Sequence, residues 1–504
     1  MQTVSPISAA ARESAVVLVT LLFSYAYFFG GSGFNQNATF ALTRAIVEQR
    51  QLQIDDYASN TADVSFHDGH TYSNKAPGLA IAASVPYAIF HAVRGAPRDA
   101  IELNLALYLC TVAVCGVSGA LIGVLLVVAA RRRGLSPVAS IAIALLTGLG
   151  TPIFAYSTML FAHVPAALLV LLGFLLIDDT LHPNATLAGA SMGAATFVNY
   201  LCAPLIVVLL VFGLRRRGLR FSIPYILGGL PFAVVLAAYQ FAAFGSPFRT
   251  AIATTNPAFL DESKWLGIFA QPRLDALWGI TFSPFRGLFF LSPLLLIALV
   301  GLVLLARSKR AAAWTIVAAF GITLFVNAAF NGWHGGYSVG PRYVLHVIPL
   351  LALGLIEMHG RARLLTGVLA CVSLLFNFAV TAVDPQPPDV LGNPLGRYAL
   401  PSLVTGRALE DRNVPWLADF YTGHTSTNRV AADELLPFQK HRPGSRESEW
   451  ASFNLGELLA GPGSASSVVP WLLVMSALTL SLRRRPRRET RTTPDTQTAR
   501  SRSA

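Results

Sequence analysis

Residues 101–130 read IELNLALYLCTVAVCGVSGALIGVLLVVAA and are followed directly by Arg131, Arg132 and Arg133. A run of about 20 apolar residues is long enough to cross the hydrocarbon core of a bilayer as a helix. Arginines at the end of such a run are typical of a cytoplasmic loop, because basic residues concentrate on that side of the membrane. This stretch therefore predicts a membrane-spanning helix that ends inside the cell.

The rest of the chain repeats this pattern. Of its 504 residues, 54% are hydrophobic and 13% are charged, whereas soluble domains carry about 25% charged residues. Apolar runs alternate with polar loops at 15–29, 101–130, 136–157, 163–177, 185–198, 201–214, 223–244, 288–306, 312–330, 343–358, 364–382 and 468–482. We predict an all-α polytopic membrane protein with about twelve transmembrane helices, whose extracytoplasmic loops carry amphipathic or interfacial helices.

The net charge of +12 follows from topology and not from nucleic-acid binding. Basic clusters come directly after apolar runs, at 131–133, 215–220, 307–310, 361–363 and in the tail from Arg483. This is the distribution expected of cytoplasmic loops. We therefore expect the lipid bilayer to be a partner of this chain, and nucleic acid not to be one.

The stretch 77–93 is apolar and long enough to be taken for another span. If it crossed together with 101–130 from an inside N-terminus, every later basic cluster would lie outside. The preceding Lys75 and the interior Pro86 suit a broken element at the membrane surface. We predict that 77–93 is interfacial or re-entrant; an outside N-terminus with a crossing 77–93 is the alternative.

The first external loop, 31–76, carries the densest mixture of chemical groups. Apolar residues at helical spacing predict an amphipathic helix over 37–50. Four carboxylates, two histidines, two tyrosines and one lysine follow between residues 55 and 75. A site that removes a proton and binds an anionic headgroup needs this mixture, whereas a solvent loop does not.

Three blocks of this sequence carry a resemblance to a known family. They are residues 72–78 (YSNKAPG), 283–293 (SPFRGLFFLSP) and 332–343 (GWHGGYSVGPRY). Together with the first loop they resemble the polyprenyl-phosphate-sugar-dependent glycosyltransferases of the GT-C superfold. That superfold includes the protein mannosyltransferases and the lipid A aminoarabinose transferases, and the blocks are similar to bacterial members of unassigned substrate.

The resemblance implies an inverting glycosyltransferase of the bacterial cytoplasmic membrane with its active site facing outward. The donor would be a polyprenyl-phosphate-linked sugar, and the acceptor a lipid, a glycan or a protein. The sequence assigns no cofactor; a divalent cation (Mg or Mn) could assist, but no ligand spacing indicates one. The catalytic domain would span 1–383, followed by an extracytoplasmic cap segment (384–467), the last transmembrane helix (468–482) and a basic disordered cytoplasmic tail (483–504).

One departure affects the choice of catalytic base. The superfold usually has an aspartate directly after the first span, whereas this sequence has Asn35, and an amide cannot act as a base. The base is then expected among the later acids of the loop. We favour Asp56, with Asp63 second and Asp55 third.

The remaining expected site residues fall into two groups. Lys75, Arg342 and Arg286 would bind the lipid phosphate, with His70 and His163 on the donor side. The sugar or acceptor would contact Trp333, His334, Tyr337 and Tyr72. Each also has a structural reading, since cations snorkel to headgroups and aromatic residues form belts at the membrane interface.

Two other classes of function stay open at this point. A transporter or flippase of lipid-linked sugars would place ionisable residues in mid-span, where Asn199 and Asn327 are the best polar candidates. A polysaccharide polymerase or ligase would rely on a large late external loop, for which the segment 383–467 is available. The concentration of charged residues in loops favours the transferase.

Overall fold

The computed structural model describes residues 6–405, except 32, 179, 262, 388 and 390, and residues 452–483, except 462 and 463. The described chain is dominated by helices, as the sequence predicts. Its strands form two small antiparallel sheets. One pairs β1 (Phe28–Phe29) with β4 (Phe453–Asn454), and the other is the hairpin of β2 (Val64–His67) and β3 (His70–Ser73).

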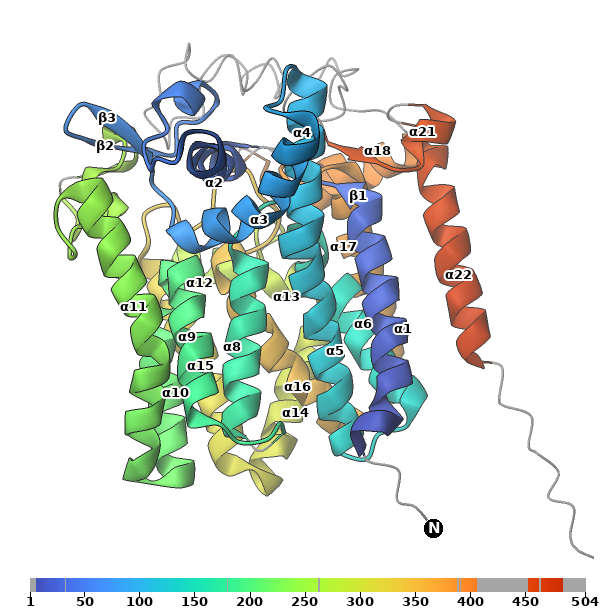
Figure 1. Cartoon of the computed structure of the whole chain (residues 1–504). Helices are drawn as coiled ribbons and strands as arrows, with labels where there is room; N and C mark the ends of the chain where they lie inside the picture. Colours follow the sequence, from blue (N-terminus) through green and yellow to red (C-terminus); the bar gives the residue numbers. More distant parts are fainter. Residues whose placement is uncertain are drawn as a thin grey trace, which may run out of the picture.

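The long helices stand side by side as a bundle (Figure 1). They are α1 (Pro6–Tyr27), α5 (Val117–Arg132), α6 (Pro137–Leu149), α8 (His163–Ile177), α9 (Ala185–Val198), α10 (Ala203–Arg217), α11 (Ser222–Phe244), α14 (Leu294–Ser308), α15 (Arg310–Ala329), α16 (Ile348–Met358), α17 (Arg363–Val383) and α22 (Val469–Arg483).

Among the described residues, four helical stretches are long and apolar enough to cross a membrane, namely 101–132, 219–244, 310–329 and 363–383. Each predicted run contains a helix of the bundle, but many of these helices are shorter than 18 residues. Turns shorten several of them, as at Gly150, where α6 ends before the short α7 (Ile153–Ser157). The number of twelve spans therefore stays a prediction.

The basic clusters meet at one end of the bundle, which we call the basic end. Arg131 lies 3.8 Å from Glu13 of α1, and Arg133 lies 3.8 Å from Asp178 and pairs with Glu357. Lys309, between α14 and α15, lies 2.8 Å from the same Asp178. These ion pairs bring the loops after α5, α8, α14 and α16 to the end at which α1 begins. This is the arrangement expected if the basic clusters share one side of the membrane with the N-terminus.

Helix α3 (Pro77–Arg94) lies across the opposite end of the bundle and not along it (Figure 1). Its buried side chains recur at helical spacing, at Leu79, Ala83, Tyr87 and Phe90. The other face exposes Val85, Ile89 and Val93. A helix with one buried and one exposed apolar face suits the surface of a bilayer, which agrees with an interfacial 77–93.

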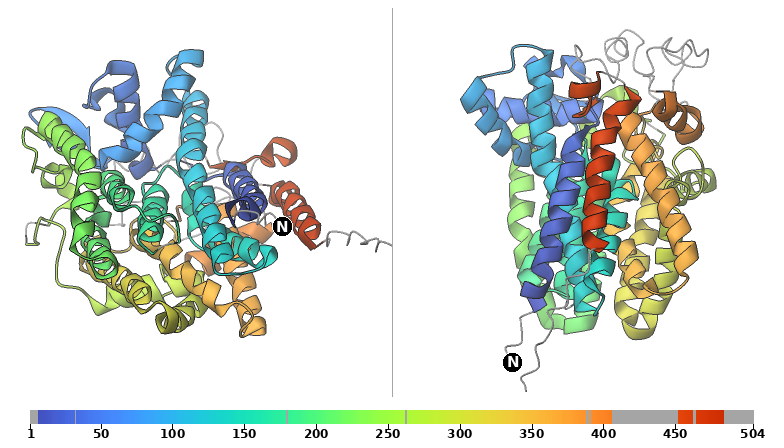
Figure 2. Two further views of the ribbon diagram at one scale, coloured as in Figure 1. Left: turned by 60° about the horizontal axis from the view of Figure 1, so that its bottom comes forward. Right: turned by 90° about the vertical axis from the view of Figure 1, so that its right-hand side faces the viewer.

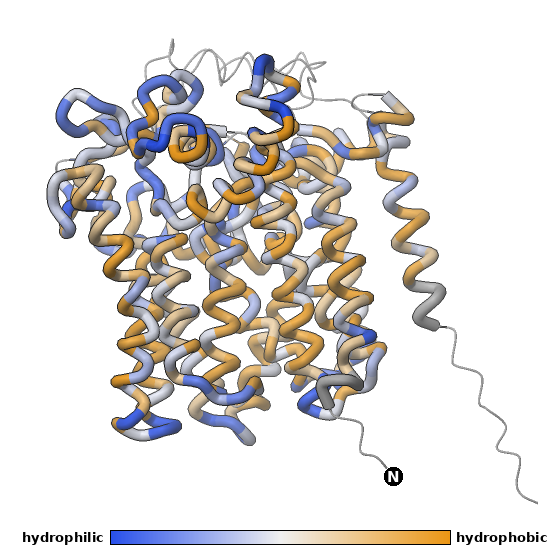
Figure 3. Tube along the Cα trace, in the orientation of Figure 1, coloured by the Kyte–Doolittle hydropathy of each residue, from blue (hydrophilic) through white to orange (hydrophobic). Residues whose placement is uncertain are grey.

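Hydrophobic residues run along most of the length of the bundle helices, whereas hydrophilic residues gather at the two ends (Figure 3). Along α11, the exposed side chains include Ile223, Ile226, Leu230, Val234 and Phe241. A soluble protein rarely exposes a continuous apolar surface of this kind. The exposed face of α11 therefore indicates a helix that faces acyl chains.

The first loop folds back along its own helix. Helix α2 (Phe34–Arg44) continues as the π-turn Ala45–Gln49, so the helix predicted over 37–50 begins three residues earlier. The 3₁₀ helix Asp55–Asn60 then returns the chain to the start of α2. There Thr61 Oγ1 donates to the Phe34 carbonyl (2.7 Å) and Asn37 Nδ2 donates to the Asn60 carbonyl (3.0 Å).

The last helix packs against the first. Trp471 Nε1 of α22 donates to Ser24 Oγ of α1 (3.1 Å), and Tyr27 OH donates to the Ser467 carbonyl (2.7 Å). The right-hand view of Figure 2 shows α22 alongside α1. Most of the expected cap segment, 406–451, and the expected tail from 484 lie outside the described residues.

Candidate functional site

A cavity of about 870 Å³ lies at the end of the bundle opposite the basic end. Its lining comes from parts of the chain that are far apart in sequence: the first loop with the start of α3, the start of α8, the α9–α10 junction, residues 252–273, Phe285, α15 with the loop and helix that follow it, and the segment after α17. Seven of the expected site residues line it: Asp63, Lys75, His163, Trp333, His334, Tyr337 and Arg342. The structure thus gathers these seven residues around one space.

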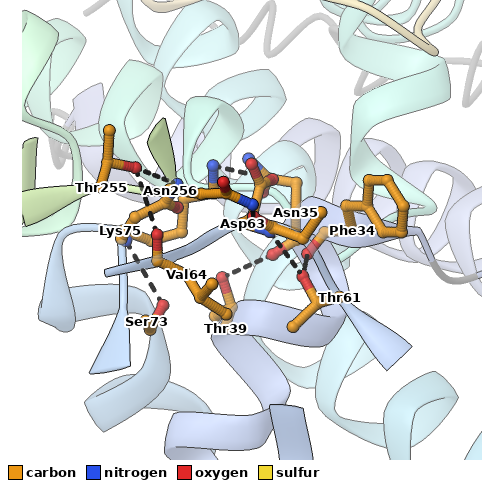
Figure 4. Close-up of polar contacts among 12 residues, drawn as sticks. Phe34, Asn35, Thr39, Thr61, Asp63, Val64, Ser73, Lys75, Thr255 and Asn256 are labelled. Carbon is orange, nitrogen blue, oxygen red and sulfur yellow. Dashed lines mark hydrogen bonds and ion pairs between the residues drawn. The ribbon is translucent and has the colours of Figure 1, made fainter. Parts of the chain in front are cut away.

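The hairpin β2–β3 places a carboxylate and a cation together in this cavity. Its register pairs Val64 with Ser73, so Asp63 and the segment Asn74–Lys75 lie next to each other where the two strands end. Asp63 Oδ2 lies 2.9 Å from Lys75 Nζ, and both side chains are largely buried. Figure 4 shows the Asp63 carboxylate with Lys75 on one side and Asn35 on the other.

The return of the chain along α2 explains why Asp63 reaches this place. Residues 60–61 are bonded to the start of α2, next to Asn35, which also lines the cavity. Asp63 therefore lies close in space to Asn35, the residue at the position where the GT-C superfold usually has its aspartate. The length of the amphipathic helix does not separate them, because the 3₁₀ helix runs back over that length.

Asp55, Asp56 and His70, in contrast, lie outside the lining of the cavity. Asp56 is exposed and accepts a hydrogen bond from Gln49 (2.6 Å) at the far end of the helix. Asp55 accepts from the Thr71 amide (2.6 Å) and lies 2.8 Å from His70 Nδ1. Burial alone would raise the pKa of Asp55, but hydrogen bonds from His70 and Thr71 outweigh it and lower that pKa. Asp55 and His70 fasten the hairpin to the 3₁₀ helix, and Asp56 holds that helix to the end of the π-turn.

Tyr72 is also outside the lining, because strand β3 turns it to the other face of the hairpin. It is buried against Phe244 of α11, with the ring centroids 5.3 Å apart. Tyr72 thus packs the hairpin onto α11, and we no longer expect it to contact a sugar.

Besides Lys75 and the exposed Arg273, which pairs with Asp275, the described residues of the cavity lining include one more cation, Arg342. Its Nη2 donates to Tyr343 OH (2.7 Å), and its guanidinium carbon lies 5.6 Å from the centre of the Phe161 ring. Its Nε is buried without a hydrogen-bond partner, and no carboxylate among the described residues lies within ion-pair distance of it. A buried guanidinium without a paired carboxylate is suited to an anionic ligand.

A glycine makes room for this arginine. Gly335 has φ +77°, and a Cβ on it would lie 2.9–3.1 Å from Arg342 side-chain atoms. The neighbouring Gly336 has φ +62°, and a Cβ on it would have no neighbour within 4 Å. Only Gly335 is therefore required for the space that Arg342 occupies.

Arg286 has a different place from the one expected. It is 1% exposed and outside the cavity lining. Its Nε donates to the His334 carbonyl (3.0 Å) and its Nη2 to the Gly336 carbonyl (2.7 Å). Burial lowers the pKa of Arg286 to about 10, so it stays charged at neutral pH. Arg286 holds the loop that carries the cavity residues and does not itself face the ligand space.

The loop held by Arg286 presents aromatic and polar groups to the cavity. Trp333 packs over Gly279, where any Cβ would overlap its ring. His334 Nδ1 accepts from the Gly336 amide (3.1 Å). Burial lowers the pKa of His334 to about 4, so this imidazole is neutral at neutral pH. A tryptophan face and a neutral imidazole are suited to a sugar ring and its hydroxyls.

Sequence reasoning missed several residues of the lining: Asn74, Gln386, Asp389 and His346. The sequence does contain a signal for His346, because an ionisable residue inside an apolar run often marks a functional site in membrane proteins. Burial raises the pKa of Asp389, which lies beyond the end of α17. Its position at the cavity depends on the fold of the 384–405 segment, for which the sequence has no periodic pattern.

Within the described ranges, no group of three His, Cys, Asp or Glu side chains is placed to hold a metal ion. The carboxylates of the lining are Asp63, which is paired with Lys75, and Asp389. The metal-ligating side chains of the lining therefore do not fit a resident divalent cation.

No protein-family model and no curated protein matches the chain. Among solved structures, the chain is similar to ArnT from Cupriavidus metallidurans, both in the apo state and bound to undecaprenyl phosphate. Both matches have 15% identity and a TM-score of 0.46, and cover 95% and 94% of this chain and 74% of that chain. It is also similar to the apo oligosaccharyltransferase of Archaeoglobus fulgidus, with 13% identity and a TM-score of 0.44, over 86% of this chain and 61% of that chain.

Proposed function

We propose that this protein is an inverting membrane glycosyltransferase that moves a sugar from a polyprenyl-phosphate donor to an acceptor hydroxyl at the outer face of the bacterial cytoplasmic membrane. The observation that carries the proposal is the Asp63–Lys75 pair, 2.9 Å apart, in a cavity that also holds Arg342. A displacement at an anomeric carbon needs a carboxylate for the acceptor proton and cations for the departing phosphate.

The geometry suggests how the pair changes when donor binds. A phosphate oxygen that accepts from Lys75 competes with Asp63 for the same ammonium group and lies within roughly 6 Å of the carboxylate, two hydrogen-bond lengths. Arg342 offers the planar fork that can bind two phosphate oxygens. The phosphate then takes the place of the carboxylate as a partner of Lys75, and Asp63 becomes available as a base.

The bond changes balance without a further reactant. The acceptor oxygen attacks the anomeric carbon from the face opposite the phosphate, and the bond from that carbon to the phosphate oxygen breaks. The electron pair stays on the polyprenyl phosphate, whose charge Lys75 and Arg342 stabilise. Asp63 takes the proton of the acceptor hydroxyl. Attack from the opposite face inverts the configuration at the anomeric carbon.

The lining of the cavity supports a lipid-linked donor. Apolar side chains from the bundle, Leu79, Val198, Leu205, Ile322 and Val326, line the cavity together with the polar groups of the loops. A ligand with a phosphate, a sugar and an isoprenoid chain presents the same combination of surfaces. A soluble sugar nucleotide would leave the apolar part without a partner.

The ion pairs at the basic end disfavour a flippase. The described residues that line the cavity belong to loops and helix ends away from that end. At the basic end, ion pairs of Arg131, Arg133 and Lys309 with acidic partners join the loops. A flippase needs a path that opens on both sides of the membrane, whereas a transferase needs only the outer cavity. The polymerase alternative depends on a late loop whose central part, 406–451, lies outside the described residues.

The test uses the full-length protein in lipid nanodiscs. We expect the wild-type protein to bind undecaprenyl phosphate. When membranes of the producing cell are added as the source of acceptor, the protein should release undecaprenyl phosphate from an undecaprenyl-phosphate sugar. Lys75→Ala should weaken binding at least tenfold, about 1.4 kcal/mol. Arg98→Ala, an exposed arginine outside the cavity lining, is the matched control. Wild-type protein that binds no undecaprenyl phosphate, or equal binding by Lys75→Ala and Arg98→Ala, would overturn the proposal.

A further inference from the structure

Five polar side chains line the part of the cavity that is built by bundle helices, and we call them the inner cluster. They are His163, Asn199, Thr323, Asn327 and His346. All five are at most 8% exposed. They come from α8, the α9–α10 junction, α15 and the 3₁₀ turn Arg342–Val347, so four separate parts of the bundle converge on one place.

Within the inner cluster, some hydrogen-bond donors and some acceptors have no partner among the described residues. Asn199 Nδ2 lies 3.0 Å from His163 Nδ1, so His163 accepts there and keeps Nε2–H as a donor. Thr323 Oγ1 donates to the Ala319 carbonyl (2.8 Å) and lies 3.4 Å from His346 Nε2. Neither amide atom of Asn327 has a partner among the described residues, and neither has His346 Nδ1.

The inner cluster carries no carboxylate, lysine or arginine, but it begins next to the cation proposed to bind phosphate. The guanidinium of Arg342 lies 5.6 Å from the Phe161 ring centre and 4.7 Å from the Tyr343 ring centre. Both rings contact His163, at 5.9 and 5.8 Å between centroids. A group attached to a phosphate at Arg342 would therefore reach the inner cluster.

We propose that the inner cluster is the pocket for the transferred sugar and that it selects an uncharged sugar through its hydroxyls. This inference rests on the proposed function. Each hydroxyl is both a donor and an acceptor, and the unpartnered groups of Asn327 and His346 together with His163 are a mixture of both kinds. Buried polar groups of this kind require partners.

The same pocket disfavours charged sugars. An ammonium on the sugar would lose its hydration there and find no carboxylate among the five residues. A carboxylate on the sugar would also lose its hydration, and the neighbouring cation, Arg342, is already the partner of the donor phosphate. A hydroxyl at the same position loses less hydration and finds hydrogen bonds. The expected order is therefore neutral sugar before amino sugar or uronic acid.

The first experiment measures competition against labelled undecaprenyl phosphate in nanodiscs of full-length protein. The competitors are undecaprenyl phosphates that carry glucose, an amino sugar or galacturonic acid. We expect the glucose lipid to compete at least tenfold better than either charged lipid. Binding of undecaprenyl phosphate without this preference overturns the inference and leaves the proposed function standing. No binding of undecaprenyl phosphate overturns the proposed function itself.

The second experiment uses variants with a matched control on one helix. Thr323 and Thr315 both donate to the carbonyl four residues earlier at 2.8 Å, but only Thr323 lines the cavity. Thr323→Val and Asn327→Leu should lose most of the preference for the glucose lipid, whereas Thr315→Val should keep it. Asn327→Asp should improve competition by the amino-sugar lipid. Affinity for sugar-free undecaprenyl phosphate reports that each variant is folded. Equal preferences in Thr323→Val and Thr315→Val would refute the assignment.

Discussion

At the scale of single residues, the position of Asp63 sets the chemistry of the cavity. Its carboxylate is held by Lys75 at 2.9 Å, while Asp56 is exposed and bonded to Gln49 outside the lining. We expect Asp63→Asn to lower sugar transfer at least about 100-fold, the usual contribution of a positioned base. Asp56→Asn is the matched control from the same loop and should transfer at the wild-type rate. Initial rates at saturating donor decide between them, and a large loss in Asp56→Asn alone would return the base to that residue.

Gly335 gives a second prediction at this scale, because the effect of backbone strain can be separated from the effect of contact. Gly335→Ala and Gly336→Ala both place a side chain at positive φ, but only the first puts a Cβ within 2.9–3.1 Å of Arg342. We expect Gly335→Ala to weaken undecaprenyl phosphate binding at least tenfold more than Gly336→Ala. Binding isotherms of the two variants make the comparison. Equal losses would show that strain, and not displacement of Arg342, is responsible.

At the scale of elements, α3 decides which loops share a side of the membrane. Asp68, in the hairpin turn before α3, and Arg98, after it, are both exposed, as is Arg215 at the end of α10. In a background with the exposed Cys371 replaced by serine, Asp68→Cys and Arg98→Cys should both react with an impermeant thiol reagent added outside the cell. Arg215→Cys should react only after permeabilisation. Labelling of Asp68→Cys but not of Arg98→Cys in intact cells would mean that α3 crosses.

The segment that follows α17 contains a buried acid with a measurable pH dependence. Asp384 is 1% exposed, accepts from the Gln386 amide (2.7 Å) and from Tyr398 OH (3.1 Å), and burial raises its pKa to about 6. The folded protein then holds this proton more tightly than the unfolded chain. Stability should therefore fall as pH rises from about 4 to 6, by about 3 kcal/mol from this group, and stay level above.

Asp384→Asn tests this contribution, since an amide can accept from the Gln386 amide and donate to Tyr398. We expect the variant to lose that fall in stability between pH 4 and 6 and to be more stable than wild type at pH 7. Thermal unfolding followed by tryptophan fluorescence across this pH range measures both effects. Parallel pH profiles of the two proteins would contradict the prediction.

The helices and loops also show how much of the structure can be predicted from the sequence. Apolar runs and basic clusters predict the helices and the end at which α5, α8, α14 and α16 meet, because both follow from transfer into a bilayer. Position along the chain favours Asp56 over Asp63 as the base. The structure places Asp63, and not Asp56, in the cavity lining, through two features with little sequence signal: the 3₁₀ helix that reverses the chain, and the register of a hairpin whose strands have four residues each. Arg286 was misplaced for a similar reason, since a buried arginine that binds carbonyls and one that binds phosphate look the same in a sequence.

At the scale of the whole molecule, the cavity and the basic end lie at opposite ends of the bundle, and their independence can be tested. The basic end is joined by Asp178, which is 1% exposed and lies 2.8 Å from Lys309 and 3.8 Å from Arg133. Removal of one partner from a buried ion pair costs about 3 kcal/mol or more, because the remaining charge is left unpaired. We expect Asp178→Asn to lower the unfolding temperature without changing the affinity for undecaprenyl phosphate by more than about twofold, since the two sites share no residue.

Two controls give this prediction its meaning. Asp275→Asn breaks an exposed pair with Arg273, both about 60% exposed, and should change stability much less than Asp178→Asn, because solvent screens an exposed pair. The double variant Asp178→Asn with Lys309→Met should be more stable than Asp178→Asn alone, because it removes one of the cations left without a partner. If Asp178→Asn is no less stable than Asp275→Asn, the ion pairs do not hold the basic end together. If it weakens ligand binding tenfold at a temperature where it is folded, the two ends are coupled, and the molecule is then closer to a transporter that links its two sides than to a transferase with one outer cavity.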